Sequence, residues 1–133
     1  MKNCIFCEVV KGNAKSWKVY ESQSVYAFLD IHPVNEFHTL VIPKNHFENI
    51  FDLPEKEMTE VMRVVHKLAR EYHDKLGINN LQIIHCSGRE AQQSVFHVHF
   101  HIVPRQFGDG QDVVWKTHPE WTEHYDQLLE KLK

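Results

Sequence analysis

Apolar and polar positions change their period along the chain, and each period predicts a different element. Between positions 52 and 77, apolar residues recur at helical spacing with charged residues between them, which is typical of a helix with one buried face. Asp52, three residues before Glu55, is expected to cap the start of this helix, and Gly77 to end it. We expect the helix to lie across a sheet and to bury one stripe. The stripe comprises Met58, Val61, Met62, Val65, Leu68, Ala69, Tyr72 and Leu76.

Short runs rich in β-branched and aromatic residues predict strands on either side of this helix. These runs occupy residues 18–20, 25–29, 37–42, 81–85 and 96–103. The first two flank a polar turn at 21–24 and predict a hairpin, and helical spacing returns around 125–132. Because the strands flank one helix and do not alternate with helices, we expect an α+β fold. It would hold an antiparallel five-stranded sheet, one long helix and a C-terminal helix. No repeat or linker divides the chain, so residues 1–133 are interpreted as a single domain.

Length and charge narrow the classes of protein to which the chain can belong. A chain of 133 residues is long enough to bury a core of its own. Its net charge of −3 and the absence of a Lys/Arg cluster argue against binding to a nucleic-acid polymer, although a single nucleotide needs no basic patch. We find no signal-peptide region and no apolar run of membrane length, and therefore expect a cytoplasmic protein with no membrane partner. Three cysteines, an odd number, do not suit a disulfide framework.

A run of histidines near position 100 carries the strongest chemical signal. His97, His99 and His101 alternate with apolar residues, and the run ends at Pro104. In a strand, side chains at a period of two share one face, so we expect a row of imidazoles on one side and core residues on the other. Imidazole acts as a nucleophile, an acid or base, or a metal ligand near neutral pH. The plainer interpretation is an exposed strand face that is rich in histidine by chance.

Cys4 and Cys7 form a C-x-x-C pair, whose spacing lets two thiolates converge on one zinc ion. A structural zinc takes four ligands, so its other two would be histidines, of which the chain has 11. A redox pair is the rival interpretation, but we expect neither a strand leading into these cysteines nor a helix beginning at them. Two cysteines buried in the core are a third possibility, and the spacing alone leaves the choice open.

The histidine run and its lead-in resemble the signature of the histidine triad (HIT) family. Residues 97–103 match the pattern His-φ-His-φ-His-φ-φ, where φ is apolar, and residues 93–96, Gln-Ser-Val-Phe, resemble the family's lead-in. The resemblance covers nearly the whole chain and is closest to the Hint branch in its zinc-carrying bacterial form. The other similar segments, in the family's order, are residues 4–7, 27–31, 38–44 and 114–118.

The resemblance implies the HIT fold and a nucleotidyl hydrolase or transferase. Such an enzyme cleaves a nucleoside 5′-monophosphate, usually a purine one such as AMP, from an amine, a phosphate chain or a sugar phosphate. His99 would attack the α-phosphorus and carry the nucleotidyl group until water releases it. This suits imidazole, which near its pKa is both a nucleophile and a good leaving group. His101 and His38 would orient His99 and stabilise phosphoryl charge, and Gln93 and Ser94 would donate to phosphate oxygens. No catalytic metal is expected.

The resemblance also implies that the nucleoside lies against the N-terminal segment and the end of the hairpin. Asp30 offers two acceptor oxygens, which suit the paired hydroxyls of ribose. Without the resemblance, a turn or N-cap role for Asp30 is favoured. The base would lie among four apolar residues, each equally plausible in the core: Ile5, Phe6, Phe28 and Ile31.

A structural zinc is also implied. Zinc-carrying relatives use the two cysteines, the histidine of a Pro-Lys-x-His segment and the first histidine of the triad. In this sequence the set is Cys4, Cys7, His46 and His97. The ion would tether the N-terminal segment to the back of the catalytic strand and stabilise the fold.

The resemblance further implies a homodimer. Relatives pair through their long helices and edge strands, and their C-terminal segments approach the partner's active site. Trp115 and Trp121 would take that part here, although apolar residues on a helix more often belong to an ordinary core.

Three departures from the family pattern bear on function. Cys86 and Ser87 stand where relatives commonly have asparagine, and Gln92 replaces a glycine, which adds bulk and constrains the backbone beside the phosphate site. Ala14 and Lys15 stand in place of an Ile-Pro pair that often flanks the nucleoside pocket. These changes would retune the preference for leaving group or base, or slow turnover.

Two other functions stay open. A non-catalytic nucleotide-binding or signalling module would keep the pocket without turnover, and the departures at Cys86 and Gln92 favour it. A metal-dependent hydrolase would use the histidine cluster as a catalytic zinc site with an open position, and its activity would fall on chelation and return with zinc.

Overall fold

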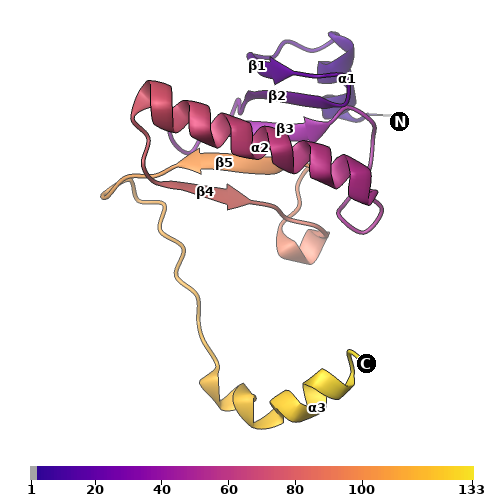
Figure 1. The fold of residues 1–133 in the computed structure, drawn as a ribbon, viewed down its shortest axis with the longest axis vertical. Coiled ribbons are helices and arrows are strands. Elements are labelled where there is room, and N and C mark those ends of the chain that lie inside the picture. Colours follow the sequence, from indigo (N-terminus) through magenta and orange to yellow (C-terminus); the bar gives the residue numbers. More distant parts are fainter. Residues whose placement is uncertain (1–2) are drawn as a thin grey trace.

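The computed structural model describes residues 3–133 and is built on an antiparallel sheet of five strands in the order β1-β2-β3-β5-β4 (Figure 1). The strands are β1 (Lys18–Glu21), β2 (Val25–Leu29), β3 (Thr39–Pro43), β4 (Leu81–Ile84) and β5 (Phe100–Pro104). β5, the last strand in the chain, lies between β3 and β4 and pairs with both. The expected α+β fold and the expected hairpin of β1 and β2 are confirmed.

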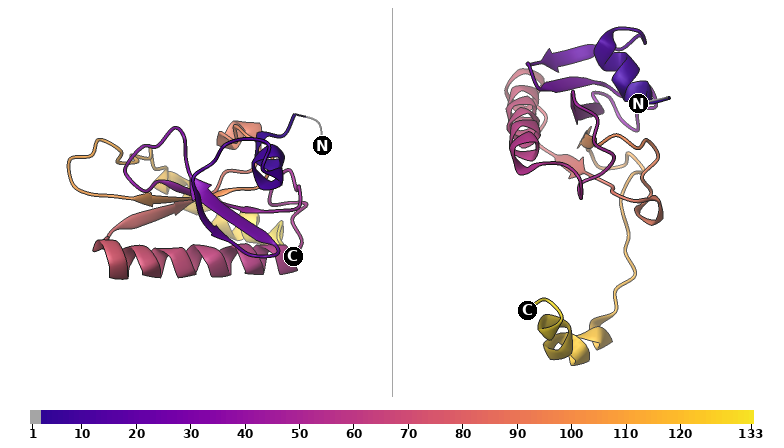
Figure 2. Two further views of the ribbon diagram at one scale, coloured as in Figure 1. Left: turned by 90° about the horizontal axis from the view of Figure 1, so that it is seen from above. Right: turned by 90° about the vertical axis from the view of Figure 1, so that its right-hand side faces the viewer.

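Helices cover both faces of the sheet. α2 (Glu55–Leu76) crosses one face and α1 (Ile5–Lys11) lies on the other, as the left view of Figure 2 shows. A 3₁₀ turn, Arg89–Ala91, follows β4, and a second one, Pro119–His124, leads into α3 (Tyr125–Glu130). Within residues 3–133, none of the helices combines the length and the apolar character that a membrane crossing requires.

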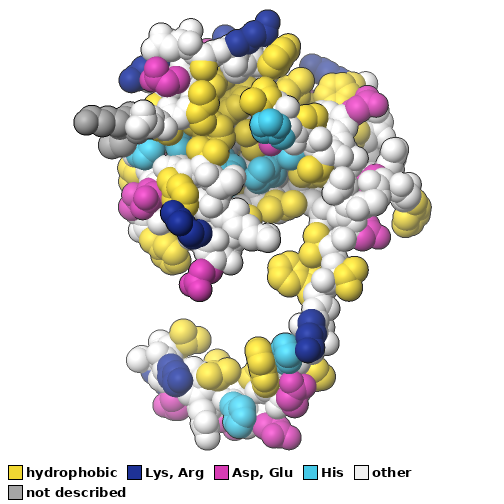
Figure 3. Space-filling model, turned by 180° about the vertical axis from the view of Figure 1, so that it is seen from behind, with side chains coloured by type: hydrophobic (Ala, Val, Ile, Leu, Met, Phe, Trp, Pro, Cys, Tyr) yellow, Lys and Arg dark blue, Asp and Glu magenta, His cyan; other side chains and the backbone are white. Residues whose placement is uncertain are grey.

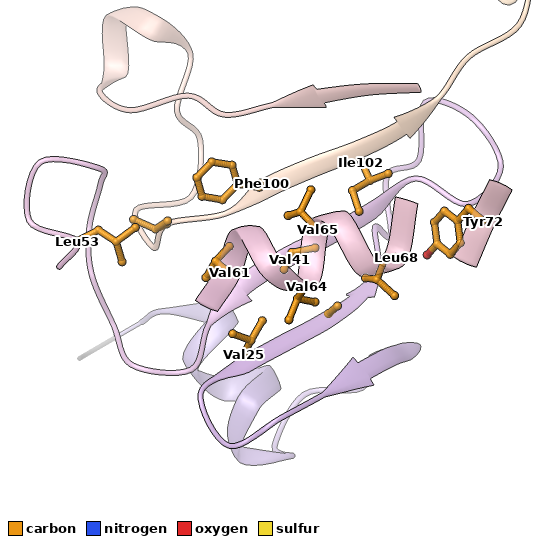
Figure 4. Packing of buried hydrophobic residues seen from close by; sticks show 12 residues of the cluster. Val25, Val41, Leu53, Val61, Val64, Val65, Leu68, Tyr72, Phe100 and Ile102 are labelled. Carbon is orange, nitrogen blue, oxygen red and sulfur yellow. The ribbon is translucent and has the colours of Figure 1, made fainter. Parts of the chain in front are cut away.

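The larger core lies between α2 and the sheet (Figure 4). The apolar partners of the histidine run lie on this side, with Val98 and Ile102 fully buried and Phe100 nearly so. Burial of one such side chain contributes roughly 1.5–3 kcal/mol to the free energy of unfolding. Leu76, expected in the stripe, is 43% exposed because it lies in the last turn of α2. The buried residues of α2 are Val61, Val64, Val65, Leu68 and Tyr72.

The two expected caps of α2 have different outcomes. Gly77 ends the helix as expected, with φ +69° and its N–H directed to the carbonyls of Tyr72 and His73. The expected N-cap at Asp52 is wrong, because Pro54 occupies that position. The carboxylate of Asp52 instead accepts the backbone N–H groups of the preceding loop, at positions 48 and 49, over 3.2 and 3.0 Å.

α1 was not expected from the sequence, and it begins directly after Cys4. The Sγ of Cys4 accepts the N–H of Cys7 at 3.4 Å, so the first cysteine caps the helix that carries the second. The expectation that no helix begins at these cysteines is therefore wrong. α1 buries Phe6 and Val9 against the face of the sheet that α2 leaves free.

The strand that carries the histidine run is shorter than expected. β5 begins at Phe100, so His97 and His99 precede the paired segment. Here the backbone follows a loop instead of a neighbouring strand, since Val98 N–H donates to the carbonyl of Phe47 at 2.7 Å. The expected row of three histidines on one strand face is therefore wrong in part. The ring of His97 points toward a pair of cysteines. Of the three histidines in the run, only His99 and His101 line the cavity described below.

The chain after residue 111 extends away from the sheet (Figure 1). The expected C-terminal helix is present as α3, but none of its residues is buried within the described chain. Trp115 is 80% and Trp121 57% exposed.

Candidate active site

An apolar cavity of about 460 Å³ opens beside α1, on the face of the sheet opposite α2. Figure 3 shows histidine side chains gathered next to hydrophobic ones on this face. A volume of this size lies within the range of small-molecule sites. The lining residues are Ile5, Phe6, Val9, Ala14, Lys15, Ser16, Phe28, Asp30, Ile31, His32, Leu40, Ser94, Val95, His99 and His101.

His99 lines this cavity with its ring orientation fixed from behind. Its Nδ1 lies 2.8 Å from the carbonyl oxygen of His97, and a carbonyl oxygen only accepts, so neutral His99 carries its hydrogen on Nδ1. Its Nε2 is then left with a lone pair. Phe6 holds the ring edge-on, with centroids 5.2 Å apart. The arrangement therefore offers an oriented nucleophile.

His38 and His101 form a second directed pair. The backbone N–H of Val34 donates to Nδ1 of His38 at 3.1 Å, so neutral His38 carries its hydrogen on Nε2. That Nε2 donates to Nδ1 of His101 at 2.8 Å. His101 is left with an Nε2–H donor, and its ring lies 5.1 Å from that of His99 between centroids. This donor is suited to a phosphoryl oxygen beside the nucleophile.

Burial keeps these imidazoles neutral. It lowers the pKa of His99 and His38 below the ordinary value, because desolvation penalises the charged form. The pKa of His101 falls to about 4, first through burial and then through the neighbouring His99 and His38. His99 therefore keeps its Nε2 lone pair at neutral pH.

Asp30 lies at the end of β2, next to the pair of histidines. Its Oδ1 accepts the backbone N–H of His32 at 2.8 Å, which is the turn role considered for it. Its Oδ2 lies 3.4 Å from Nε2 of His38. The carboxylate also lines the cavity, so the turn fixes an acceptor group at the cavity wall.

Gln93 and Ser94 are adjacent in sequence but differ in their surroundings. Ser94 is exposed and lines the cavity, where its hydroxyl can reach a ligand. Gln93 is buried, and its Nε2 donates to the carbonyls of Glu48 at 2.6 Å and Val95 at 3.1 Å. Its Oε1 accepts the N–H of Gly88 at 2.7 Å. Both amide hydrogens are thus used, and we assign the Gln93 side chain to support of the loop and not to phosphate.

All four apolar residues expected around the base line the cavity, namely Ile5, Phe6, Phe28 and Ile31. Phe6 and Phe28 are buried and pack edge to face at 5.5 Å between centroids, whereas Ile31 is 65% exposed at the mouth. Sequence reasoning missed five residues of the lining. Val9 belongs to α1, which was not expected, and Leu40 was assigned to a strand without a site role. The other three enter the wall from turns or loops and carry no pattern of their own: Ser16, His32 and Val95.

Cys4, Cys7, His46 and His97 bring four ligand atoms to within 4.8 Å of one another behind His99. Sulfur-to-Nδ1 distances are 3.4 Å from Cys4 to His97, 3.6 Å from Cys7 to His97 and 3.4 Å from Cys7 to His46. Tetrahedral zinc with ordinary bond lengths requires a sulfur-to-nitrogen separation of about 3.6 Å. The four residues therefore fit a zinc ion.

The hydrogen bond behind His97 and the burial of Cys7 also suit a metal. Nε2 of His97 lies 2.8 Å from the carbonyl oxygen of Pro43 and donates to it, which leaves Nδ1 as the unprotonated ligand atom. Burial raises the pKa of Cys7 to about 11, so a bound cation would have to displace the thiol proton. With two imidazoles converging on the cysteines, the metal interpretation is favoured over a redox pair.

Asp30, His38 and His101 also bring possible ligand atoms within 4.8 Å of one another. The two imidazoles there hydrogen-bond directly to each other at 2.8 Å. A zinc ion bound to both would need their nitrogens about 3.3 Å apart. The observed geometry therefore suits a proton-ordered pair better than a metal centre.

The departures from the family pattern lie around this site. Gln92 adopts φ +73°, in the left-handed region that favours glycine, so the expected backbone constraint is present. Lys15 lines the cavity, and its Nζ lies 5.0 Å from the ring centroid of Trp17. Cys86 is half-buried beside Ser87, whose bonds are described below.

The fold and the site define an α+β protein that brings oriented histidines to a cavity of nucleotide size. Residues 11–108 match the model of the HIT domain, and the chain belongs to the HIT family. Protein hit of Bacillus subtilis is 45% identical over 120 residues, covering 90% of this chain and 83% of that protein. Adenosine 5'-monophosphoramidase HNT1 of Candida albicans is 36% identical over 138 residues, covering 98% and 90%. A zinc-bound histidine triad family protein from Mycobacterium smegmatis is structurally similar, with TM-score 0.78, 32% identity and 97% of each chain covered.

Proposed function

We propose that this protein releases a nucleoside 5′-monophosphate from a larger substrate by hydrolysis, or transfers that nucleotidyl group to another acceptor. The substrate would be a purine nucleotide of the AMP type joined to an amine, as in a phosphoramidate, or to a related ester or anhydride. The observation that carries the proposal is the unprotonated Nε2 of His99 on the wall of a cavity of about 460 Å³. The monophosphoramidase activity named for the similar HNT1 protein supports the choice of substrate.

The reaction has two steps that share one nucleophile. Nε2 of His99 forms a bond to the α-phosphorus while the bond from phosphorus to the leaving group breaks. The leaving group takes the electron pair and a proton relayed from solvent through the Ser94 hydroxyl, which gives up one proton and takes up another. Water then attacks phosphorus, the bond to His99 breaks, and the proton released by water returns to solvent. The Nε2–H of His101 would stabilise negative charge on the phosphoryl oxygens in both steps.

Binding of the nucleotide would depend on the residues around the nucleophile. The base would lie among Phe6, Phe28, Ile5 and Ile31, which exclude water from one side, and Asp30 would accept from the ribose hydroxyls. This arrangement fixes the α-phosphorus near His99, and orientation of that kind lowers the barrier without new chemistry.

We further propose a structural zinc held by Cys4, Cys7, His46 and His97. When bound, zinc cross-links α1 to the segment that precedes β5, and it supplies folding free energy rather than Lewis-acid chemistry. Because thiolate ligands must stay reduced, the proposal also favours a reducing compartment such as the cytoplasm.

We also propose a homodimer. The chain after residue 111 carries apolar side chains that the rest of the described chain does not cover, including Val114, Trp115 and Leu132. β4 is an edge strand and exposes Ile83. A second copy of the chain would cover both surfaces.

Replacing the nucleophile tests the proposed function. His99→Ala should abolish release of AMP from adenosine 5′-phosphoramidate, while the affinity for AMP changes by less than about tenfold, because the base and ribose contacts remain. AMP release is followed by chromatography and AMP binding by calorimetry. Retention of more than a trace of activity would remove His99 as the nucleophile.

The second candidate is a nucleotide-binding module without turnover. The strained backbone at Gln92, directly before Gln93 and Ser94, favours this candidate. The loop that carries these two residues then depends on an uncommon backbone conformation. Tight AMP binding by the wild-type protein with no release from any phosphoramidate would support this candidate over the enzyme.

A further inference from the structure

Beyond the end of β4, a side chain continues the contact with β5. The ladder between these strands ends at the pair Ile84 and His101. The next residue, His85, stacks its ring on Phe100, with centroids 4.4 Å apart and planes at 24°. Its Nδ1 lies 2.9 Å from the backbone carbonyl oxygen of His99. His85 therefore contacts the peptide group that carries the proposed nucleophile.

The partners of His85 fix the position of its ring hydrogen. The carbonyl oxygen of His99 only accepts, so Nδ1 of neutral His85 carries the hydrogen and donates. Nε2 is then an acceptor, and the Oγ of Ser87 donates to it at 2.5 Å. The same Oγ accepts the backbone N–H of Ile50 at 2.9 Å. One directed chain of hydrogen bonds thus runs from Ile50 through Ser87 and His85 to His99, and we name it the His85 brace.

The His85 brace connects two loops that flank the site. Ile50 belongs to the loop between β3 and α2, and Ser87 to the loop between β4 and the triad. The side chain of Gln93 joins the same two loops, because it bonds to Glu48 and Gly88. The loop between β4 and the triad is therefore fixed at two points, Ser87 and Gln93. The brace differs from the Gln93 connection because it ends on His99 itself.

We propose that His85 and Ser87 are positioning residues that hold the peptide group of His99, and so direct its ring at the α-phosphorus. The inference rests on the proposed function, because it concerns the same nucleophile. Neither His85 nor Ser87 lines the cavity, so they act through His99 and not on the nucleotide. A displacement of about 1 Å in a reacting group can lower a rate by about 100-fold, which makes such a brace measurable.

Two substitutions at position 85 separate the hydrogen bond from the ring stacking. His85→Phe keeps an aromatic ring against Phe100 and removes both hydrogen bonds. His85→Asn loses the ring but keeps an amide N–H near the position of Nδ1. With adenosine 5′-phosphoramidate, His85→Phe should lower kcat about tenfold or more and leave the affinity for AMP within about twofold. His85→Asn should recover most of the lost kcat.

Ser87→Ala and a matched control test the outer half of the brace. Ser87→Ala leaves the donor of His85 in place but releases its ring, so kcat should fall by a smaller factor, about threefold. Ser22→Ala removes the same kind of bond in the β1–β2 turn, where Oγ accepts the N–H of Val25 at 3.1 Å. That variant should keep the wild-type kcat.

Three results would overturn the proposal in variants that melt as cooperatively as the wild type. In the first, His85→Phe keeps the wild-type kcat. In the second, its affinity for AMP falls as far as kcat, as expected of a purely structural role. In the third, His85→Asn is no more active than His85→Phe.

Failure of the proposed function can be told apart from failure of the brace, because the wild-type protein itself would then release no AMP. The brace is still tested by the ¹⁵N shifts of the imidazole nitrogens under conditions in which the rings are neutral. We expect His85 to be protonated on Nδ1 both in the wild type and in Ser87→Ala, because the carbonyl oxygen of His99 still accepts from Nδ1. Protonation of His85 on Nε2 in the wild-type protein would overturn the brace whatever the activity.

Discussion

At the scale of single residues, the three histidines of the run carry their ring hydrogens differently, because their hydrogen-bond partners differ. His97 donates to Pro43 and turns its lone pair to the cysteines, whereas His99 donates to a carbonyl and keeps its lone pair for the cavity. His101 accepts from His38 and keeps a donor. The motif predicted which histidines to assign to the site. Their proton positions could not be predicted, because those depend on backbone groups, such as the N–H of Val34, that the fold brings from distant segments.

The low pKa of His101 predicts a loss of stability in acid. The folded protein holds this imidazole neutral with a pKa of about 4, against an ordinary value of 6.5. Protonation therefore favours the unfolded chain. The contribution of His101 to the free energy of unfolding is complete above pH 6.5 and is lost as the pH falls toward about 4.

The variant His101→Gln, which cannot take up this proton, isolates the effect. Urea unfolding near pH 7.5 and near pH 4.5 should show a smaller acid-induced loss in His101→Gln than in the wild type. Buried His38 also has a lowered pKa, so part of the loss should remain in the variant. Equal losses in the two proteins would contradict the assignment of His101.

At the scale of elements, length decided what the sequence could predict. α2 has 22 residues, and its apolar period was clear enough to place it and its end at Gly77. α1 has only 7 residues, too few for a period to stand out, and its cap is a cysteine sulfur instead of a common capping residue. The start of α2 was misplaced for a related reason, since the carboxylate of Asp52 bonds within its own loop.

The zinc set predicts that α1 depends on a metal. Elemental analysis should find about one zinc per chain, because four ligands in tetrahedral reach form a closed structural site. Cys4→Ser with Cys7→Ser should lose the ion, lower the melting temperature and weaken AMP binding, since Phe6 of α1 lines the cavity.

Cys86→Ser is the matched control for the zinc experiment, because Cys86 lies outside the cluster. It should keep both the zinc content and the melting temperature. A native protein without metal would contradict the zinc assignment, and so would full zinc content in the doubly substituted variant.

At the scale of the whole molecule, packing within a single chain does not explain the apolar pattern of the C-terminal segment. The helical spacing around 125–132 predicted α3 correctly, but the apolar side chains that produce this spacing are exposed. Leu129 is 57% and Leu132 84% exposed. A pattern of apolar positions predicts that a face is covered and does not say by what, so the covering partner could not be derived from spacing.

A homodimer that covers this segment should be sensitive to charge there. The wild-type chain should sediment as a dimer, and Trp115→Glu with Leu129→Glu should shift it to a monomer, because a buried unpaired carboxylate is costly. Lys116→Glu, at an exposed polar position in the same segment, is the matched control and should stay dimeric. A wild-type monomer would contradict the proposed dimer.

The central claim is that His99 carries the nucleotidyl group between the two steps of the reaction. Its most direct test is to mix the protein with adenosine 5′-phosphoramidate, quench within the first turnover, and locate any covalent adduct by peptide mass spectrometry. We predict an adenylyl group on the peptide that contains His99, formed also after brief exposure to a metal chelator and absent from His99→Ala. An adduct on another residue, or AMP release with no adduct at any time, would contradict the account.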